Sequence, residues 1–159
     1  MTSFITADLF DAHPDAASCD TPFRVFGQRR SFSGTIRTVL CYHDNVLLKN
    51  LLGQPGAGSV LVVDGGGSMH CALIGDMIAL LGLNSGWSGV VVNGCIRDSV
   101  AIGQMAFGIK ALGTNPRKSD KCGAGAVDVP VTFGGVTFTP GHHLYSDDDG
   151  ILVAAAPLV

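Results

Sequence analysis

Runs of apolar residues alternate along this chain with short glycine-rich or polar breaks. Apolar stretches predict strands at residues 33–44, 59–67, 89–94 and 109–116. Segments bounded by capping and breaking residues predict helices at residues 3–13, 45–56, 76–86 and 97–108, the first with Thr6 as a candidate cap. The strand at 59–67 is apolar throughout, which is typical of a strand buried on both faces.

The C-terminal part follows a different pattern. Residues 129–156 predict three short strands joined by Gly-Gly, Pro-Gly and Asp-Gly turns. Strands and helices alternate first, and strands then follow strands. The pattern therefore predicts an α/β fold of mixed layers with a β-rich tail, in a single domain over residues 1–159.

The scarcity of charge changes this picture. Only 14% of the residues are charged, against about 25% in an average protein. No apolar run approaches the ~20 residues of a membrane helix, and the N-terminal segment carries Asp8 and Asp11 but no basic leader, which argues against a signal peptide. We therefore expect no membrane segment, and an oligomer with apolar interfaces.

The charge balance and the cysteines exclude several classes of protein. The net charge of −3 argues against direct nucleic-acid binding, and the small basic clusters at 27–30 and 115–121 are typical of solvated loops. None of the five cysteines has C-x-x-C spacing, so neither a zinc site nor a disulfide framework is indicated. The expectation is a cytoplasmic protein with reduced cysteines.

Glycines follow the strand at 59–67 in the sequence DGGGS, residues 64–68. The segment lacks the lysine of a phosphate-binding loop, and His70 stands where a dinucleotide fingerprint needs its third glycine. Two interpretations stay open, a turn packed closely against its neighbours or a segment lining a site. His70 is a further candidate for the lining of a site, with the alternative that a lone histidine is usually structural.

The helix at 76–86 begins next to Gly75. Its first N–H groups, those of Asp76, Met77 and Ile78, have no acceptor within the helix and favour a bound anion such as a carboxylate. Taken alone, Asp76 is a simple N-cap.

Arg97 and Asp98 stand side by side after the strand at 89–94. If this strand and the one at 59–67 are parallel, the segments that carry Asp76 and the Arg97–Asp98 pair meet at the edge of the sheet where α/β proteins bind ligands. Arginine offers a planar fork for a carboxylate, and aspartate is a ligand for Mg²⁺ or Mn²⁺. A local ion pair or a helix cap is the structural alternative.

Two other polar clusters point to no chemistry. His142 and His143 are adjacent on a predicted strand, so they face opposite sides of it. The acidic run at 147–149 lacks the spacing of a calcium loop and is typical of a solvated hairpin turn.

Several segments together resemble the family called regulator of ribonuclease activity A (RraA), which also contains 4-hydroxy-4-methyl-2-oxoglutarate aldolases. They include VLVVDGGGS, GDMIA, GWSGVVVNGCIRD, GIKALGTNPRKS and the tail from DVPVTFGG to LYSDDDGILVA, so the resemblance runs from about residue 4 to residue 154. Asp76, twenty intervening residues and then Arg97–Asp98 match the family's catalytic signature.

The resemblance implies a swivelling β/β/α domain like that of phosphohistidine proteins, assembled as a trimeric ring with sites near subunit interfaces. It implies that Asp98 holds Mg²⁺ or Mn²⁺, that Arg97 binds the carboxylate and carbonyl of pyruvate, and that the Asp76 and Met77 N–H groups bind the carboxylate. The Asp76 side chain would orient a water.

Two functions follow from the resemblance. The first is a class II, metal-dependent lyase that acts on small 2-oxo acids through a pyruvate enolate, as an aldolase, an oxaloacetate decarboxylase or both. The second is a non-catalytic regulator that binds an RNA-degrading ribonuclease through protein contacts. Acids that often follow Arg-Asp in the family are missing here, where SVAIGQ follows, and the chain ends at Val159 without the longer tail of some aldolases.

Overall fold

Parallel strands from the four apolar stretches lie side by side in the middle of the fold. A computed structural model describes residues 3–159, so Met1 and Thr2 of the predicted domain lie outside the described residues. The helices are α1 (Thr6–Ala12), α2 (Val46–Leu52), α3 (Asp76–Asn84) and α4 (Ser99–Ile102). The strands are β1 (Ala17–Ser18), β2 (Arg24–Val25), β3 (Phe32–Leu40), β4 (Val60–Asp64), β5 (Ala72–Ile74), β6 (Gly89–Ile96), β7 (Gly108–Thr114), β8 (Ala126–Val127), β9 (Val131–Phe133), β10 (Val136–Phe138), β11 (His143–Ser146) and β12 (Ile151–Ala154).

The main sheet is mixed, with the order β1-β12-β11-β3-β4-β6-β7-β2. Neighbours among β3, β4, β6 and β7 are parallel, whereas β11, β12 and β1 extend the sheet antiparallel beyond β3. The short strand β5 pairs parallel with the end of β6. Since β4, β5 and β6 all run the same way, the segments that follow them emerge at one edge of the sheet, as the sequence predicted.

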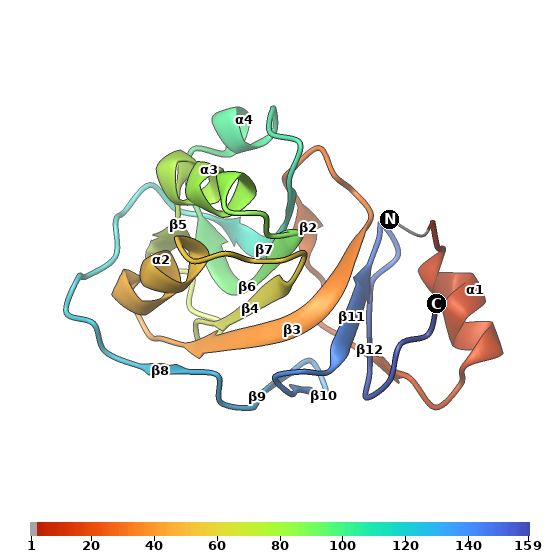
Figure 1. The fold of residues 1–159 in the computed structure, drawn as a ribbon. Helices are drawn as coiled ribbons and strands as arrows, with labels where there is room; N and C mark the ends of the chain where they lie inside the picture. The colour runs from red at the N-terminus through yellow and green to blue at the C-terminus, as the bar shows by residue number, and fades with distance from the viewer. Residues whose placement is uncertain (1–2) are drawn as a thin grey trace.

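The core lies on both faces of the parallel strands. Helices α2 and α3 cover one face, with α4 beyond α3 (Figure 1), over a cluster that includes Leu61, Val90 and Phe107. On the other face a second cluster joins Phe32 and Val91 to the β9–β10 hairpin. Every residue of β6 is buried, which explains its continuous apolar sequence.

The structure corrects several predicted elements. Residues 129–156 form four strands, β9 to β12, rather than three, because each of the three turns joins a separate pair. The helix predicted at 97–108 is a single turn, α4, and β5 was not predicted. Thr6 is not the cap of α1: the helix begins at Thr6, and Ile5 occupies the cap position. No helix within residues 3–159 combines the length and apolarity needed to cross a membrane.

The acidic turn at 147–149 is more than a solvated hairpin. The Asp147 carboxylate accepts hydrogen bonds from the backbone N–H and the hydroxyl of Thr6, at 2.7 and 2.6 Å, and so ties the turn to α1. The buried ammonium of Lys110, a residue of β7, donates to the carbonyls of Asp147 and Gly150. Burial lowers the pKa of Lys110, although the nearby Asp147 and Asp148 oppose that change. The turn is therefore a structural junction between the sheet and α1.

Candidate active site

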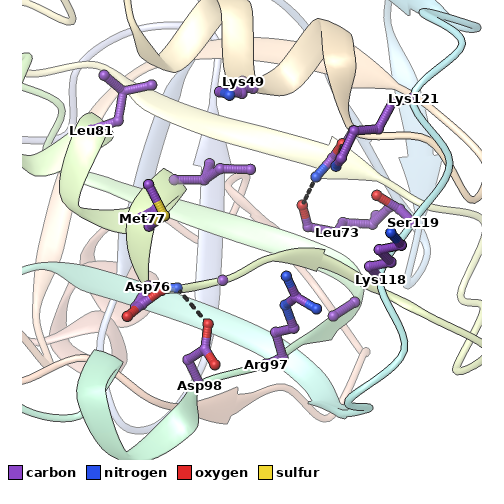
Figure 2. A pocket seen from close by; sticks show the side chains of 14 residues that line it. Lys49, Leu73, Asp76, Met77, Leu81, Arg97, Asp98, Lys118, Ser119 and Lys121 are labelled. Carbon is purple, nitrogen blue, oxygen red and sulfur yellow. Dashed lines mark hydrogen bonds between the residues drawn. The ribbon is translucent and has the colours of Figure 1, made fainter.

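A cavity of about 330 Å³ opens where β5 and β6 end, and residues of α2 and α3 form part of its lining. Figure 2 shows the cavity from close by, with Asp76 and Asp98 on one side of the view, Lys118 and Lys121 on the other, and Arg97 between them. The six residues predicted for the site all line it: Gly75, Asp76, Met77, Ile78, Arg97 and Asp98. The structure thus brings them together, while their roles stay predictions.

The start of α3 differs from its prediction in two respects. Asp76 is the first helical residue, and the cap position belongs to Gly75, which makes no side-chain cap. The Asp76 N–H is not available for a ligand, because it donates to Oδ2 of Asp98 at 3.0 Å (Figure 2). The anion at this helix terminus is therefore the Asp98 carboxylate itself.

Asp98 reaches α3 because its backbone is left-handed, with φ 57° and ψ 40°. This conformation turns the chain sharply after β6 and costs an L-residue roughly 1–2 kcal/mol, least for aspartate, asparagine and glycine. Of the two structural alternatives, a helix cap and a local ion pair, the first holds for Asp98, because its carboxylate accepts the first N–H of α3. No ion pair forms between Arg97 and Asp98; the ion pairs within residues 3–159 are Arg30–Asp148 and Arg37–Asp128.

Gly75 leaves room for these two side chains. A Cβ atom at residue 75 would lie 2.7 Å from Oδ2 of Asp98 and 3.4 Å from Cγ and Nε of Arg97. The backbone of Gly75 is extended, with φ −114°. Space rather than backbone conformation therefore calls for glycine at this position.

A Gly75→Ala substitution should displace the Asp98 carboxylate and leave the fold intact, because the obstructing atom is the end of a side chain. From the metal role that the resemblance implies for Asp98, we expect this variant to have about 10- to 100-fold less magnesium-dependent turnover, the usual cost of disturbing the support of a metal ligand. Steady-state kinetics and thermal unfolding would measure both effects. Gly53→Ala is the matched control, since its Cβ would make only ordinary contacts, with Leu81 at 3.5 Å. Equal activity of the two variants would contradict the prediction.

The Arg97 side chain has no hydrogen-bond partner within residues 3–159. Its backbone N–H donates to the carbonyl of Ile74 at 2.9 Å and fixes the residue beside β5. The side chain is exposed and lines two hollows, the main cavity and a second one of about 330 Å³ with Thr114, Asn115 and Pro116. An unpaired guanidinium in a hollow is ready to bind an anion.

The predicted solvated loop at 115–121 is exposed at Lys118 and Lys121, but it also borders the cavity, and its Ser119 is buried there. Lys118 and Lys121 line the cavity, as do Lys49 from α2 and the buried Asn45. The available signal was the position of this basic cluster directly after a strand, the same place that Arg97 and Asp98 occupy after β6.

Asp44 holds the loop with the lysines in place. Its carboxylate accepts the backbone N–H groups of Val46, Cys122 and Gly123 at 2.6–3.2 Å. Burial would raise the pKa of Asp44, but these hydrogen bonds outweigh burial and keep the pKa below its usual value. Single β-bridges pair Lys118 with Ala72 and Asp120 with Asp44. The loop is therefore fixed to β5 and to the start of α2.

A lowered pKa in the folded state makes stability depend on pH. The stabilisation from Asp44 is present above the unfolded-state value of about 3.9 and is lost as pH falls through the folded pKa. Asp128 and Asp147 have lowered pKa values too. We expect the free energy of unfolding to fall below pH ~4. Asp44→Asn should lower it by about 1–3 kcal/mol at pH 7 and make its decrease between pH 4 and 3 less steep. Urea denaturation from pH 7 to 3 measures this, with the exposed Asp11→Asn as control. A free energy of unfolding that falls as steeply with pH in Asp44→Asn as in the parent would contradict this prediction.

The glycine-rich turn and His70 lie outside the cavity lining. Asp64 accepts the N–H of Gly66 at 2.9 Å and the side-chain amide of Asn93 at 3.0 Å, which favours the turn-and-packing interpretation. His70 lies beside Arg117, and its ring centroid is 4.9 Å from that of His43.

The donor set suits a loosely held divalent ion. No group of three or more His, Cys, Asp or Glu side chains converges within residues 3–159. One oxygen of Asp98 faces the Asp76 N–H, and the other makes no hydrogen bond to residues 3–159. Mg²⁺ commonly keeps several waters and takes one or two carboxylates plus the substrate. With one carboxylate oxygen free, Asp98 fits the metal-ligand role that the resemblance implies, and that role stays a prediction.

Fold and cavity together define a mixed α/β protein with an arginine–carboxylate site at the ends of parallel strands. A family model described as RraA-like (Aldolase/RraA) matches residues 6–153, and the chain belongs to this family. The resemblance seen in the sequence is thereby confirmed.

Solved structures of relatives agree with this. A protein from Geobacillus kaustophilus HTA426 described as S-adenosylmethionine: 2-dimethylmenaquinone methyltransferase is 47% identical, with TM-score 0.96, over 98% of this chain and 97% of that one. The RNA-processing inhibitor RraA from Thermus thermophilis is 41% identical, with TM-score 0.95, over 98% and 95%. Streptomyces coelicolor RraAS2, of the RNase ES inhibitor RraA protein family, is 29% identical, with TM-score 0.76, over 94% and 77%.

Proposed function

We propose that this chain is a divalent-metal-dependent lyase that cleaves small 2-oxo acids through the enolate of pyruvate. The observation that carries the proposal is the meeting of Asp76, Arg97 and Asp98 at one cavity, with Arg97 lacking an acidic partner there. The substrates would be 4-hydroxy-4-methyl-2-oxoglutarate, oxaloacetate or both.

The roles of the side chains follow from their charges. Arg97 would bind the 2-oxo acid end, so that its N–H groups face the oxygen on which negative charge develops as the C–C bond breaks. In decarboxylation the electrons of that bond pass to the 2-oxo group, carbon dioxide leaves, and the resulting enolate takes a proton to become pyruvate. Asp76, at the cavity wall, would hold the water that delivers this proton, or accept the hydroxyl proton in the aldol cleavage.

Asp98 would hold Mg²⁺ or Mn²⁺, which when bound supplies Lewis-acid stabilisation of the enolate oxygen. Met77 and Ile78 follow Asp76 in the first turn of α3, and their N–H groups would face the substrate carboxylate. Because Asp98 takes the Asp76 N–H, this helix terminus also fixes the direction of the metal ligand.

The deciding experiment is pyruvate release from oxaloacetate and from 4-hydroxy-4-methyl-2-oxoglutarate, with Mg²⁺ and with EDTA. Turnover above the metal-only background that EDTA abolishes is the expected result. The absence of turnover on both substrates would overturn the proposal.

A methyltransferase function, named for the Geobacillus relative, fits this cavity less well. S-adenosylmethionine carries a sulfonium cation, while the cavity lining has four basic side chains, Lys49, Arg97, Lys118 and Lys121, and two carboxylates, Asp76 and Asp98. Such a lining favours anions.

Regulation of a ribonuclease is the second candidate, favoured by the 41% identity to the Thermus inhibitor. Such a function would act by contact with the ribonuclease, because the net charge of −3 provides no track for RNA phosphates. Inhibition of a ribonuclease by a variant without lyase activity would support it.

For the assembly we propose a trimeric ring of domains like those of swivelling phosphohistidine proteins. Light scattering at micromolar concentration should give about three times the 16.4 kDa of one chain. The low share of charged residues, 14%, is the physical reason, because interfaces between subunits cover apolar surface. A mass of 16.4 kDa would contradict the trimer.

A further inference from the structure

The fold buries one lysine outside the candidate active site. Lys110 of β7 is 2% exposed, and within residues 3–159 it is the one lysine or arginine that is buried. A buried charge is usually paired with an opposite one. The ion pairs in the described part of the chain are Arg30–Asp148 and Arg37–Asp128, so Lys110 has no carboxylate partner there. Lys110 thus lacks the partner that a purely structural cation would have.

Two backbone carbonyls hold the nitrogen of Lys110. It donates to the carbonyl of Asp147 at 2.5 Å and to that of Gly150 at 3.1 Å. The Asp147 carboxylate is itself taken by Thr6. The two contacts use two N–H groups, and a lysine ammonium has three. The third position of the nitrogen, a proton in the ammonium or a lone pair in the neutral amine, has no partner within residues 3–159.

This nitrogen lies beside a separate pocket of about 200 Å³, which we call the lysine pocket. Its lining consists of residues 19–23, Lys110 and residues 148–151, and therefore includes Gly150, whose carbonyl the nitrogen contacts. Backbone hydrogen bonds hold the segment 19–23 in place, from the Cys19 N–H to the carbonyl of Ile151 at 3.0 Å and from the Asp20 N–H to that of Gly134 at 2.8 Å. The lysine pocket is therefore a preformed hollow with an amine in its wall.

Burial favours the neutral, nucleophilic form of this amine. It lowers the pKa of Lys110, and the nearby Arg30 acts in the same direction, whereas Asp147, Asp148 and Cys19 oppose the change. Desolvated lysines are the ones that form imines with carbonyl compounds in other proteins. Position and burial together therefore suit Lys110 to react with a carbonyl group in the lysine pocket.

The charge of the lining selects the kind of carbonyl compound. The carboxylates of Asp20, Asp148 and Asp149 belong to the lining, so a 2-oxo acid or another anion is repelled. The protonated imine of a lysine and an aldehyde is a cation, and neighbouring carboxylates favour the charged form of such a group. The lining therefore favours a small aldehyde without a charge of its own.

We propose that Lys110 forms an imine with a small uncharged aldehyde bound in the lysine pocket. The lone pair of the nitrogen forms a bond to the carbonyl carbon, and the π electrons of the C=O bond move to the oxygen, which takes up a proton. Loss of that oxygen as water leaves a C=N bond. The amine and the aldehyde thus give the imine and one water, without an oxidant or a reductant. The site does not depend on the proposed function, since Lys110 does not line the cavity that contains Arg97.

The test compares acetaldehyde with glyoxylate, which are two-carbon aldehydes that differ in charge. Each is incubated with the parent protein at pH 7, and cyanoborohydride converts any imine into a stable amine. Peptide mapping by mass spectrometry then measures the adduct at each lysine. With acetaldehyde we expect at least about tenfold more adduct at Lys110 than at any of the exposed lysines, and with glyoxylate no such preference. The exposed lysines are Lys49, Lys118 and Lys121.

Lys110→Arg and Lys118→Arg form a matched pair of variants. The guanidinium of an arginine at residue 110 can still donate to both carbonyls but does not form the imine, so the intact variant should lose most of the acetaldehyde adduct of the parent. Lys118→Arg removes an exposed lysine and should keep that adduct. Thermal unfolding of both variants shows whether the exchange at residue 110 disturbs the fold.

The comparison among lysines is made within the parent protein and does not depend on the folding of a variant. An adduct at Lys110 no more abundant than at Lys118 would overturn the proposal, and Lys110 would then serve only as a donor to the acidic turn. Equal labelling of Lys110 by acetaldehyde and glyoxylate would overturn the assignment of an uncharged ligand.

Discussion

An Asp98→Asn variant should fold as the parent does and lose about 100-fold or more of its magnesium-dependent pyruvate release. The substitution changes little except charge. Asparagine tolerates the left-handed backbone of residue 98, and its side-chain oxygen can still accept the Asp76 N–H that Asp98 accepts at 3.0 Å. The negative oxygen that would bind the metal is what disappears.

Asp98→Ala separates charge from structure. Alanine removes the acceptor for the start of α3 and is strained at φ 57°, so it should lower the melting temperature as well as the activity. Titration with Mg²⁺ should show weaker activation of Asp98→Asn. Full activity of this variant at the metal concentration used for the parent would show that residue 98 is structural.

Replacement of Arg97 by lysine should cost about 2–4 kcal/mol of transition-state stabilisation, or roughly 30- to 1,000-fold in kcat/KM. Lysine keeps the positive charge but loses the planar fork that can face a carboxylate and a neighbouring oxygen together. Stability should change little, because the Arg97 side chain contributes no ion pair within residues 3–159.

Arg117→Lys is the comparison for this experiment. Arg117 is exposed, and its contacts to His70 lie outside the cavity, so its kinetics should match those of the parent. If both variants match the parent, a charge alone at residue 97 suffices and the fork has no role.

The parallel strands were predictable because their burial leaves a direct mark on the sequence. The residues of β6 are all buried, and those of β4 nearly so, so both read as continuous apolar runs. β5 has only three residues, and its partner lies more than twenty positions further along the chain, so no local pattern marks it. The helix predicted at 97–108 begins only at Ser99 because Asp98 is left-handed, and a left-handed aspartate is not visible in hydrophobic periodicity. Its other end was overestimated as well, since α4 stops at Ile102 and turns lead from there to β7.

The grouping of Gly75, Asp76 and the Arg97–Asp98 pair followed from strand direction and from the family resemblance. The hydrogen bond between Asp76 and Asp98 did not, because it depends on the backbone of one residue. The contribution of Lys118 and Lys121 to the cavity was missed because charge in a loop usually marks solvent. The loop is brought over the cavity by contacts with segments far away in the sequence, the bridges to Ala72 and Asp44 and the hydrogen bonds to the Asp44 carboxylate.

The left-handed turn at Asp98 also bears on how members of this family could change function. Of the residues that tolerate this backbone, asparagine is reached from aspartate by one base change in either aspartate codon. That single step would remove the negative charge and keep the helix contact and the fold. A single substitution would then separate a lyase from a protein that serves only as a binding partner, and no unfolded variant would have to arise on the way.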